Sequence, residues 1–106
     1  MKLSKKNENE INDIFNKLNP KEIVSHHQKV IKNSVFIALK GSNYDGREFI
    51  NDAINFGAIL IIYDKKNYIW DKSKLIKSIG ILNLKAKLGS ILSIFYKNYK
   101  RDIKII

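Results

Sequence analysis

The residues best suited to bind a ligand form one short polar segment, Gly41-Ser-Asn-Tyr-Asp-Gly46, called here the Gly41–Gly46 loop. Its two glycines allow the backbone to approach a ligand closely. Ser42 and Asn43 offer hydrogen-bond donors and acceptors, and Tyr44 offers a ring for stacking. The same residue types also make ordinary turns between a strand and a helix. The residues alone therefore predict either a ligand site or a plain turn, and they name no ligand.

Few residues of this chain are suited to catalysis or metal binding. The 106 residues include no cysteine, which excludes thiolate catalysis, disulfides and cysteine-ligated metals within them. Asp45 and Glu48 lie three residues apart, a spacing that capping of a helix start explains. His26 and His27 are adjacent in a segment expected to be extended, where neighbouring side chains point to opposite sides. We therefore predict no catalytic residue and no metal ligand.

The Gly41–Gly46 loop lies between a predicted strand and a predicted helix. Residues 35–39 are apolar, as in a buried strand, and Asp45 is a suitable N-cap for a helix that ends near Gly57. Residues 58–63 form a second apolar strand, typical of a sheet covered on both faces. This order predicts a βαβ unit, in which ligands bind at the carboxyl ends of the strands and backbone N–H groups at the helix start favour anions.

Further elements flank the βαβ unit. Residues 1–10 are polar and predicted to be a frayed tail. Two more strands and two helices are predicted, the strands at 22–25 and 77–82 and the helices at 11–18 and after Asn83. The predicted fold class is α/β, a small sheet with a βαβ unit and flanking helices. A chain of 106 residues fits a single domain, which we predict over residues 1–106.

The formal net charge of +10 raises the question of nucleic-acid binding. The chain has 18 Lys and only 2 Arg, together with 19 Ile and 12 Asn, an excess of residues with A/T-rich codons. Arg supplies most bidentate contacts to bases and phosphates, so we attribute the basicity to mutational bias and expect no nucleic-acid partner. Tyr63, Tyr68 and Trp70, interleaved with lysines, come nearest to a base-stacking surface and keep that alternative open.

The location of the protein is predicted from its apolar segments. The longest apolar run, residues 58–63, is too short to span a membrane. The N-terminal residues lack the apolar stretch of a signal peptide. We therefore expect a cytoplasmic protein without a membrane partner.

Residues 26–57 resemble the N-terminal domain of the Mur ligases, the cytoplasmic enzymes that add amino acids to the peptidoglycan precursor. In that family an Asp-Ser-Arg segment and an apolar strand lead into a Gly-x-x-x-Asp-Gly loop and a helix ending in Gly-Ala. The matching residues are Val30, Phe36 to Gly41, Asp45 to Arg47, Phe49, Ile50, Ala53, Gly57 and Ala58. The Asp-Gly-Arg sequence at 45–47 is more similar to the E-type than to the F-type ligase. The same holds for Leu82-Asn83, Leu88 and Phe95-Tyr96.

The resemblance implies a ligand and the residues that contact it. In the family this domain holds the uridine end of a UDP-sugar, and the E-type acts on UDP-N-acetylmuramoyl-L-alanyl-D-glutamate. The corresponding contact positions are His27 and then Ser42, Asn43 and Tyr44. The His26-His27-Gln28 segment departs from the family's Asp-Ser-Arg. We expect a monomer that binds this UDP-sugar.

The resemblance also implies that some functional parts are missing. The family's ATP-binding domain starts with a Thr-Gly-Thr-Asn-Gly-Lys-Thr loop after a strand similar to residues 103–106, where this sequence stops. ATP and Mg²⁺ serve the full-length family enzyme, and no cofactor is expected in this chain. We therefore interpret the chain as a truncated E-type domain without ligase activity of its own. A decayed, non-binding remnant and an F-type domain are the alternatives.

Overall fold

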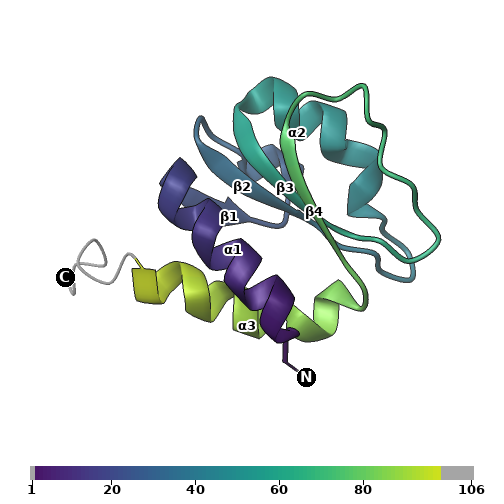
Figure 1. Ribbon diagram of the computed structural model, residues 1–106. Coiled ribbons are helices and arrows are strands. Elements are labelled where there is room, and N and C mark those ends of the chain that lie inside the picture. The colour runs from purple at the N-terminus through teal and green to yellow at the C-terminus, as the bar shows by residue number, and fades with distance from the viewer. Residues whose placement is uncertain (1, 99–106) are drawn as a thin grey trace. The chain divides into compact units, whose positions relative to one another are not determined.

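The computed structural model describes residues 2–98, which form two compact units. The sheet unit is Pro20–Lys85, and the helix unit consists of the described parts of Met1–Asn19 and Ala86–Ile106. The elements, labelled in Figure 1, are α1 (Lys5–Leu18), β1 (Glu22–Val24), η1 (His27–Lys29), β2 (Ser34–Ala38), η2 (Gly46–Phe49), α2 (Ile50–Phe56), β3 (Ala58–Asp64), β4 (Lys77–Ile81) and α3 (Leu84–Asn98), where η marks 3-10 helices.

The sheet unit contains a parallel sheet of four strands in the order β1-β2-β3-β4. The pairing places Phe36 of β2 beside Ile61 of β3, and Tyr63 of β3 beside Gly80 of β4. All five residues of β2 are buried, as the uniform apolar pattern predicts for a central strand. The predicted α/β fold class and βαβ unit are confirmed.

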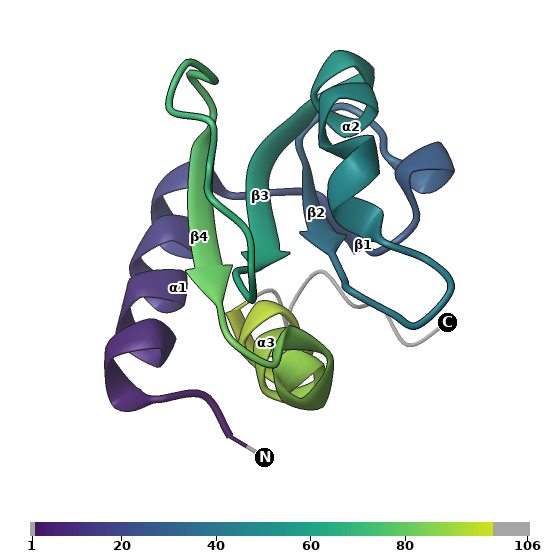
Figure 2. The ribbon, with the colours of Figure 1, turned by 90° about the vertical axis from the view of Figure 1, so that its right-hand side faces the viewer.

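The helix α2 packs on one face of this sheet, as Figure 2 shows. The core between them contains Val30, Phe36, Ala38, Ile50, Ala53, Ala58 and Ile61. Burying a large apolar side chain contributes about 1.5–3 kcal/mol relative to leaving it exposed. These contacts hold both ends of the Gly41–Gly46 loop, because the loop joins β2 to η2 and α2.

Two glycines of the sheet unit are required by close approach. Gly57 ends α2 in the left-handed region with φ 114°, as predicted, and an added Cβ would lie 2.7 Å from the Cα of Lys32. At Gly80 of β4, an added Cβ would lie 2.8 Å from the ring of Tyr63. The ring of Tyr63 in turn stacks on Trp70, with centroids 5.0 Å apart. The glycine within the predicted strand 77–82 therefore leaves room for a side chain of the neighbouring strand.

The helix unit pairs α1 with α3 through an edge-to-face contact of Phe15 and Phe95, whose ring centroids are 5.8 Å apart. The prediction of a frayed tail over residues 1–10 is wrong from Lys5 onward, where α1 begins. The Ser4 hydroxyl accepts a hydrogen bond from the Asn7 N–H at 3.1 Å and caps the helix. The cap and the buried side chain of Leu3 order a segment that its polar composition marked as loose.

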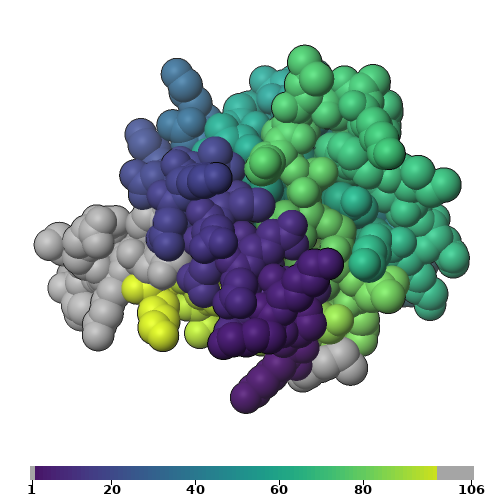
Figure 3. Space-filling model, viewed as in Figure 1, coloured from purple at the N-terminus to yellow at the C-terminus, as the bar shows by residue number. Residues whose placement is uncertain are grey.

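Some predictions concern residues outside the described part of the chain or regions without regular structure. The predicted strand or linker at 103–106 lies outside the described residues. The segment 65–76 between β3 and β4 runs largely over the surface (green in Figure 3), with Ile69 and Leu75 almost fully exposed. None of the helices in the described part is long and apolar enough to cross a bilayer.

Candidate functional site

A hollow of about 370 Å³ lies at the Gly41–Gly46 loop, after the carboxyl end of β2. This volume falls in the range of about 300–1,000 Å³ that is usual for small-molecule sites. The lining residues are Lys40, Gly41, Ser42, Asn43, Tyr44, Asp45, Glu48 and Phe49. Three of the four residues predicted to contact a ligand therefore border one hollow.

Backbone hydrogen bonds give the loop a closed shape. The Gly41 N–H donates to the Tyr44 carbonyl at 2.7 Å, and the Gly46 N–H donates to the Leu39 carbonyl at 2.7 Å. A Cβ at Gly46 would lie 3.0 Å from the Leu39 nitrogen, so a side chain there would press on the end of β2. The sequence suggested that both glycines allow a ligand to approach; the structure shows that Gly46 allows the backbone of Leu39 to do so.

Four aromatic rings lie together beside the loop. His27 stacks on Phe49 with centroids 4.1 Å apart and planes 3° from parallel. Phe49 also stacks with Tyr44 at 5.5 Å, and Tyr44 lies 6.4 Å from His26. The fourth predicted residue, His27, thus contacts a residue that lines the hollow. We call His26, His27, Tyr44 and Phe49 the ring cluster.

The prediction that His26 and His27 point to opposite sides is wrong. Their ring centroids lie 5.2 Å apart and their planes differ by 12°. The reason is that η1 begins at His27, so the two residues do not share an extended backbone. His26 Nδ1 accepts a hydrogen bond from the Gln28 N–H at 3.3 Å and caps this turn.

One polar atom of the ring cluster has no hydrogen-bond partner. His27 Nδ1 is buried and unpaired. Such atoms are uncommon in folded proteins, because leaving a buried polar group unsatisfied costs about 1–3 kcal/mol. Because His27 stacks on Phe49, which lines the hollow, an unpaired atom in this ring favours a functional interpretation of the ring cluster over a purely structural one.

Asp45 and Arg47 form the charged pair of the site. Asp45 Oδ1 accepts hydrogen bonds from the N–H and the Nε of Arg47 at 3.0 and 2.9 Å, and Oδ2 accepts from Nη2 at 2.9 Å. The hydrogen bond from Arg47 lowers the pKa of the Asp45 carboxyl, and the same bond raises the pKa of Arg47. The Arg47 N–H at the start of η2 is thus already bonded to a carboxylate. This N–H group is therefore not free to bind an external anion at the start of the helix.

Tyr44 contributes a hydroxyl as well as a ring. Its burial, and secondarily the negative charge of Asp45, raise the pKa of the phenol. The hydroxyl therefore stays protonated at neutral pH and can donate a hydrogen bond. Phe49, in contrast, lines the hollow and was named in the sequence only as a match to the family pattern. It was not among the residues predicted for the site, because α2 starts only at Ile50, after the 3-10 turn η2.

The alternative base-stacking surface is built differently. Tyr63 stacks on Trp70 and contacts Tyr68, and all three pack against the core of the sheet unit. The guanidinium of Arg47 lies 4.8 Å from the centre of the Tyr68 ring. These rings are engaged with one another and with the core, so no observation here favours binding of nucleic acid.

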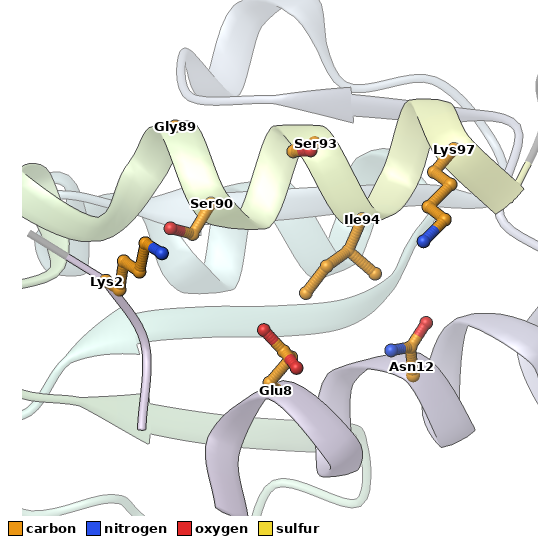
Figure 4. A pocket seen from close by; sticks show the side chains of 8 residues that line it. All are labelled: Lys2, Glu8, Asn12, Gly89, Ser90, Ser93, Ile94 and Lys97. Carbon is orange, nitrogen blue, oxygen red and sulfur yellow. The ribbon is translucent and has the colours of Figure 1, made fainter. Parts of the chain in front are cut away.

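The helix unit has a second hollow of about 540 Å³ between α1 and α3. Figure 4 shows Glu8 and Asn12 on α1 facing Ser90, Ser93 and other residues on α3, and its labelled lining is Lys2, Glu8, Asn12, Gly89, Ser90, Ser93, Ile94 and Lys97. Glu8 accepts a hydrogen bond from Lys5 at 3.4 Å. In the part of the chain that the structure describes, no three His, Cys, Asp or Glu side chains come together as a metal site.

Comparison with curated proteins finds relatives that are ligases of the same name. The chain is 41% identical over 94 residues to the UDP-N-acetylmuramoyl-L-alanyl-D-glutamate--2,6-diaminopimelate ligase of Rickettsia typhi, covering 88% of this chain and 18% of that protein. It is 34% identical over 94 residues to the ligase of the same name from Rickettsia conorii, covering 88% of this chain and 19% of the relative. A scan against models of protein families gives no match.

A solved structure gives the same result for the fold. The crystal structure of MurF ligase from Thermotoga maritima in complex with ADP superimposes with a TM-score of 0.56 and 26% identity, covering 76% of this chain and 18% of that one. The chain therefore spans less than a fifth of the length of the relatives it matches. The sequence identity to curated ligases and the shared α/β fold together show that the chain belongs to the Mur ligase family.

Proposed function

We propose that this chain is the N-terminal, UDP-sugar-binding domain of an E-type Mur ligase and acts in the cytoplasm as a monomer. Its ligand is UDP-N-acetylmuramoyl-L-alanyl-D-glutamate, the molecule after which the related ligases are named. The uridine end occupies the hollow at the Gly41–Gly46 loop and contacts His27, Ser42, Asn43 and Tyr44. The observation that carries the proposal is the stacking of His27, Phe49 and Tyr44 beside this hollow.

The ring cluster suits a pyrimidine base. Bases bind to proteins by stacking on aromatic side chains, which contributes about 1–3 kcal/mol per base. Tyr44 is 38% exposed, so part of its ring is available to a ligand. Its partner Phe49 fixes the orientation of the ring before any ligand arrives, which reduces the entropy lost on binding.

The polar side chains of the loop suit the edge of uracil. Uracil presents two carbonyl acceptors and one N–H donor, whereas cytosine carries an amino group in place of one carbonyl. The Ser42 hydroxyl and the Asn43 amide can both donate and accept hydrogen bonds, and both line the hollow. Selectivity for uridine over cytidine follows if these donors meet the carbonyl that cytosine lacks.

Lys40 supplies positive charge at the hollow. Its Nζ donates to the Gly41 carbonyl at 3.1 Å, so the ammonium group lies next to the loop. Asp45 is paired with Arg47, which leaves Glu48 as the other charged side chain lining the hollow. Lys40 is therefore the side chain suited to approach the diphosphate that follows the uridine.

The residues of this chain do not fit ATP or Mg²⁺. The sequence contains no G-x-x-x-x-G-K-[ST] phosphate loop, and the described residues include no cluster of carboxylates or histidines for a metal. We therefore assign no catalytic step to this chain. Its proposed role in the ligase reaction is to hold the nucleotide end of the substrate.

The test is a titration of the chain with UDP-N-acetylmuramoyl-L-alanyl-D-glutamate, UDP and CDP, followed by amide NMR and calorimetry. We expect both uridine compounds to bind, CDP to bind more weakly, and the shifts to concentrate at His27 and Ser42 to Tyr44. Equal binding of UDP and CDP, or a folded spectrum without selective shifts, would contradict the proposal and favour a decayed remnant.

Two matched pairs of variants locate the site. Tyr44→Ala should weaken UDP binding by about 1–3 kcal/mol, because it removes the exposed stacking ring. Tyr96→Ala, a tyrosine on α3 with a similar exposed fraction of 46%, should leave the affinity unchanged. Asn43→Ala should reduce the preference for UDP over CDP, whereas Asn51→Ala on α2 should not. Equal effects within a pair would place the ligand elsewhere.

A further inference from the structure

Arg47 joins the Gly41–Gly46 loop to the end of the neighbouring strand. Its guanidinium donates Nε and Nη2 to the two oxygens of Asp45 in the loop. Its Nη1 donates to the carbonyl of Asp64, the last residue of β3, at 2.8 Å and to the carbonyl of Lys66 at 2.7 Å. The side chain of Arg47 is only 6% exposed.

These contacts leave Arg47 little capacity to bind a ligand. A guanidinium has five N–H donors, and four hydrogen bonds to Asp45, Asp64 and Lys66 are already made. One face of the group also lies against the Tyr68 ring. Although a basic residue beside a nucleotide site suggests a phosphate contact, the geometry directs Arg47 toward the protein.

The Asp64 side chain extends this network to the end of β4. Its Oδ1 accepts a hydrogen bond from the Lys66 N–H at 2.9 Å, and its Oδ2 accepts from the N–H of Leu84, the first residue of α3, at 3.3 Å. Asp45, Arg47 and Asp64 thus tie together the segments that follow β2, β3 and β4. Buried polar networks of this kind rigidify the segments they connect when their members are satisfied.

We infer that Arg47 is a positioning residue for the ligand site: it fixes the Gly41–Gly46 loop through Asp45 and thereby sets the affinity for the nucleotide without touching it. This inference rests on the proposed function. The loop carries Ser42, Asn43 and Tyr44, and Asp45 is the residue through which Arg47 reaches them. Release of Asp45 lets these side chains sample orientations that do not bind, so a smaller fraction of the protein is competent.

The test compares UDP binding by Arg47→Met, Arg47→Lys and Asp45→Asn with the unchanged chain, at a temperature where each is folded. We expect about tenfold weaker binding for each, the lower end of the loss found when hydrogen bonds that orient metal-ligating side chains are removed. Arg47→Lys keeps the charge but lacks the planar fork, so it should not restore affinity. The double variant Asp45→Asn with Arg47→Met should bind UDP no more weakly than Arg47→Met alone, because both changes break the same contact between Asp45 and Arg47.

Two further measurements separate positioning from stability. Ile91→Val, a change at a buried position of α3 in the helix unit, should lower the thermal midpoint and leave the dissociation constant for UDP unchanged. In the unliganded chain, Arg47→Lys should speed amide hydrogen exchange at Gly41 and Gly46 more than in β3, because their N–H groups close the loop.

Each outcome decides the inference. Wild-type affinity in a folded Arg47→Met, or additive losses in the double variant, overturns the positioning role while the proposed function stands. If the unchanged chain shows no preference for UDP over CDP, the proposed function fails and this inference fails with it. If Arg47→Met does not fold, Asp45→Asn decides the question, since it keeps the bonds of Arg47 to Asp64 and Lys66.

Discussion

Asp45 has two structural roles that a short sequence motif cannot separate. Its carboxylate caps η2 through the Arg47 N–H, and it also holds the Arg47 side chain. The cap was predicted from the sequence, because Asp followed by a helical pattern is a local signal. The ion pair was not predicted, because the orientation of Arg47 depends on its hydrogen bonds to the carbonyls of Asp64 and Lys66, at and just after the end of β3, which are distant in the sequence.

The lowered pKa of Asp45 predicts a dependence of stability on pH. An unfolded Asp titrates near about 3.9, and the bond from Arg47 places the folded pKa below that value. The stabilisation by this carboxylate is therefore present above about pH 4 and is lost as the pH falls through the folded pKa. Urea denaturation from pH 3 to 7 should show a difference between the unchanged chain and Asp45→Asn that shrinks below about pH 4.

The control for this prediction is Asn51→Ala, which changes an exposed, uncharged side chain of α2 outside the Asp45–Arg47 pair. The unchanged chain and this variant should lose stability in parallel as the pH falls. A constant difference between the unchanged chain and Asp45→Asn over the whole range would show that the carboxylate is not stabilised by Arg47.

At the scale of elements, the boundaries of α2 decide the geometry of the site. The sequence predicted one helix from Asp45 to about Phe56, whereas the structure has η2 followed by a short α2. The 3-10 turn places Phe49 beside His27 and Tyr44. Tertiary packing of the rings is not visible in a local pattern. At the other end of α2, Gly57 follows from sequence alone, because a left-handed helix end favours glycine.

The two glycines at Gly57 and Gly89 predict opposite effects of the same substitution. Gly57→Ala should destabilise the chain by more than about 1 kcal/mol, because φ is 114° and the new Cβ would lie 2.7 Å from the Cα of Lys32. Gly89→Ala, in α3, should stabilise it by about 0.5–1 kcal/mol, since nothing lies within 4 Å of its Cβ. Thermal and urea denaturation of both variants check this, and effects of equal sign would contradict it.

At the scale of the molecule, the helix unit joins segments from the two ends of the described chain. Phe15 of α1 is fully buried and contacts Phe95 of α3. Phe15→Ala should therefore lower the free energy of unfolding by about 3–5 kcal/mol, through lost burial and a cavity. The matched control is Ile69→Ala, an apolar truncation at a position 91% exposed, expected to stay within about 0.5 kcal/mol. Similar losses in both variants would show that this contact does not hold the unit.

The sequence by itself determined the strands of the sheet unit and the family. Strands, caps and the Gly57 helix end depend on neighbours along the chain, so their patterns are local. The same patterns failed at Lys5–Glu10, where a Ser4 cap turns a polar tail into helix. A local pattern also does not show how far a neighbouring element covers a helix face: Phe56 and Tyr96 are 53% and 46% exposed.

Only the tertiary structure decided how the candidate site is built. His27 and Phe49 lie 22 positions apart in the sequence, yet their rings are 4.1 Å apart, because they follow the carboxyl ends of the adjacent parallel strands β1 and β2. The hydrogen bonds of Arg47 to Asp64 and Lys66 arise in the same way, from the adjacency of the ends of β2 and β3. Contacts between residues distant in the chain follow from strand order and packing, which composition and periodicity do not encode position by position.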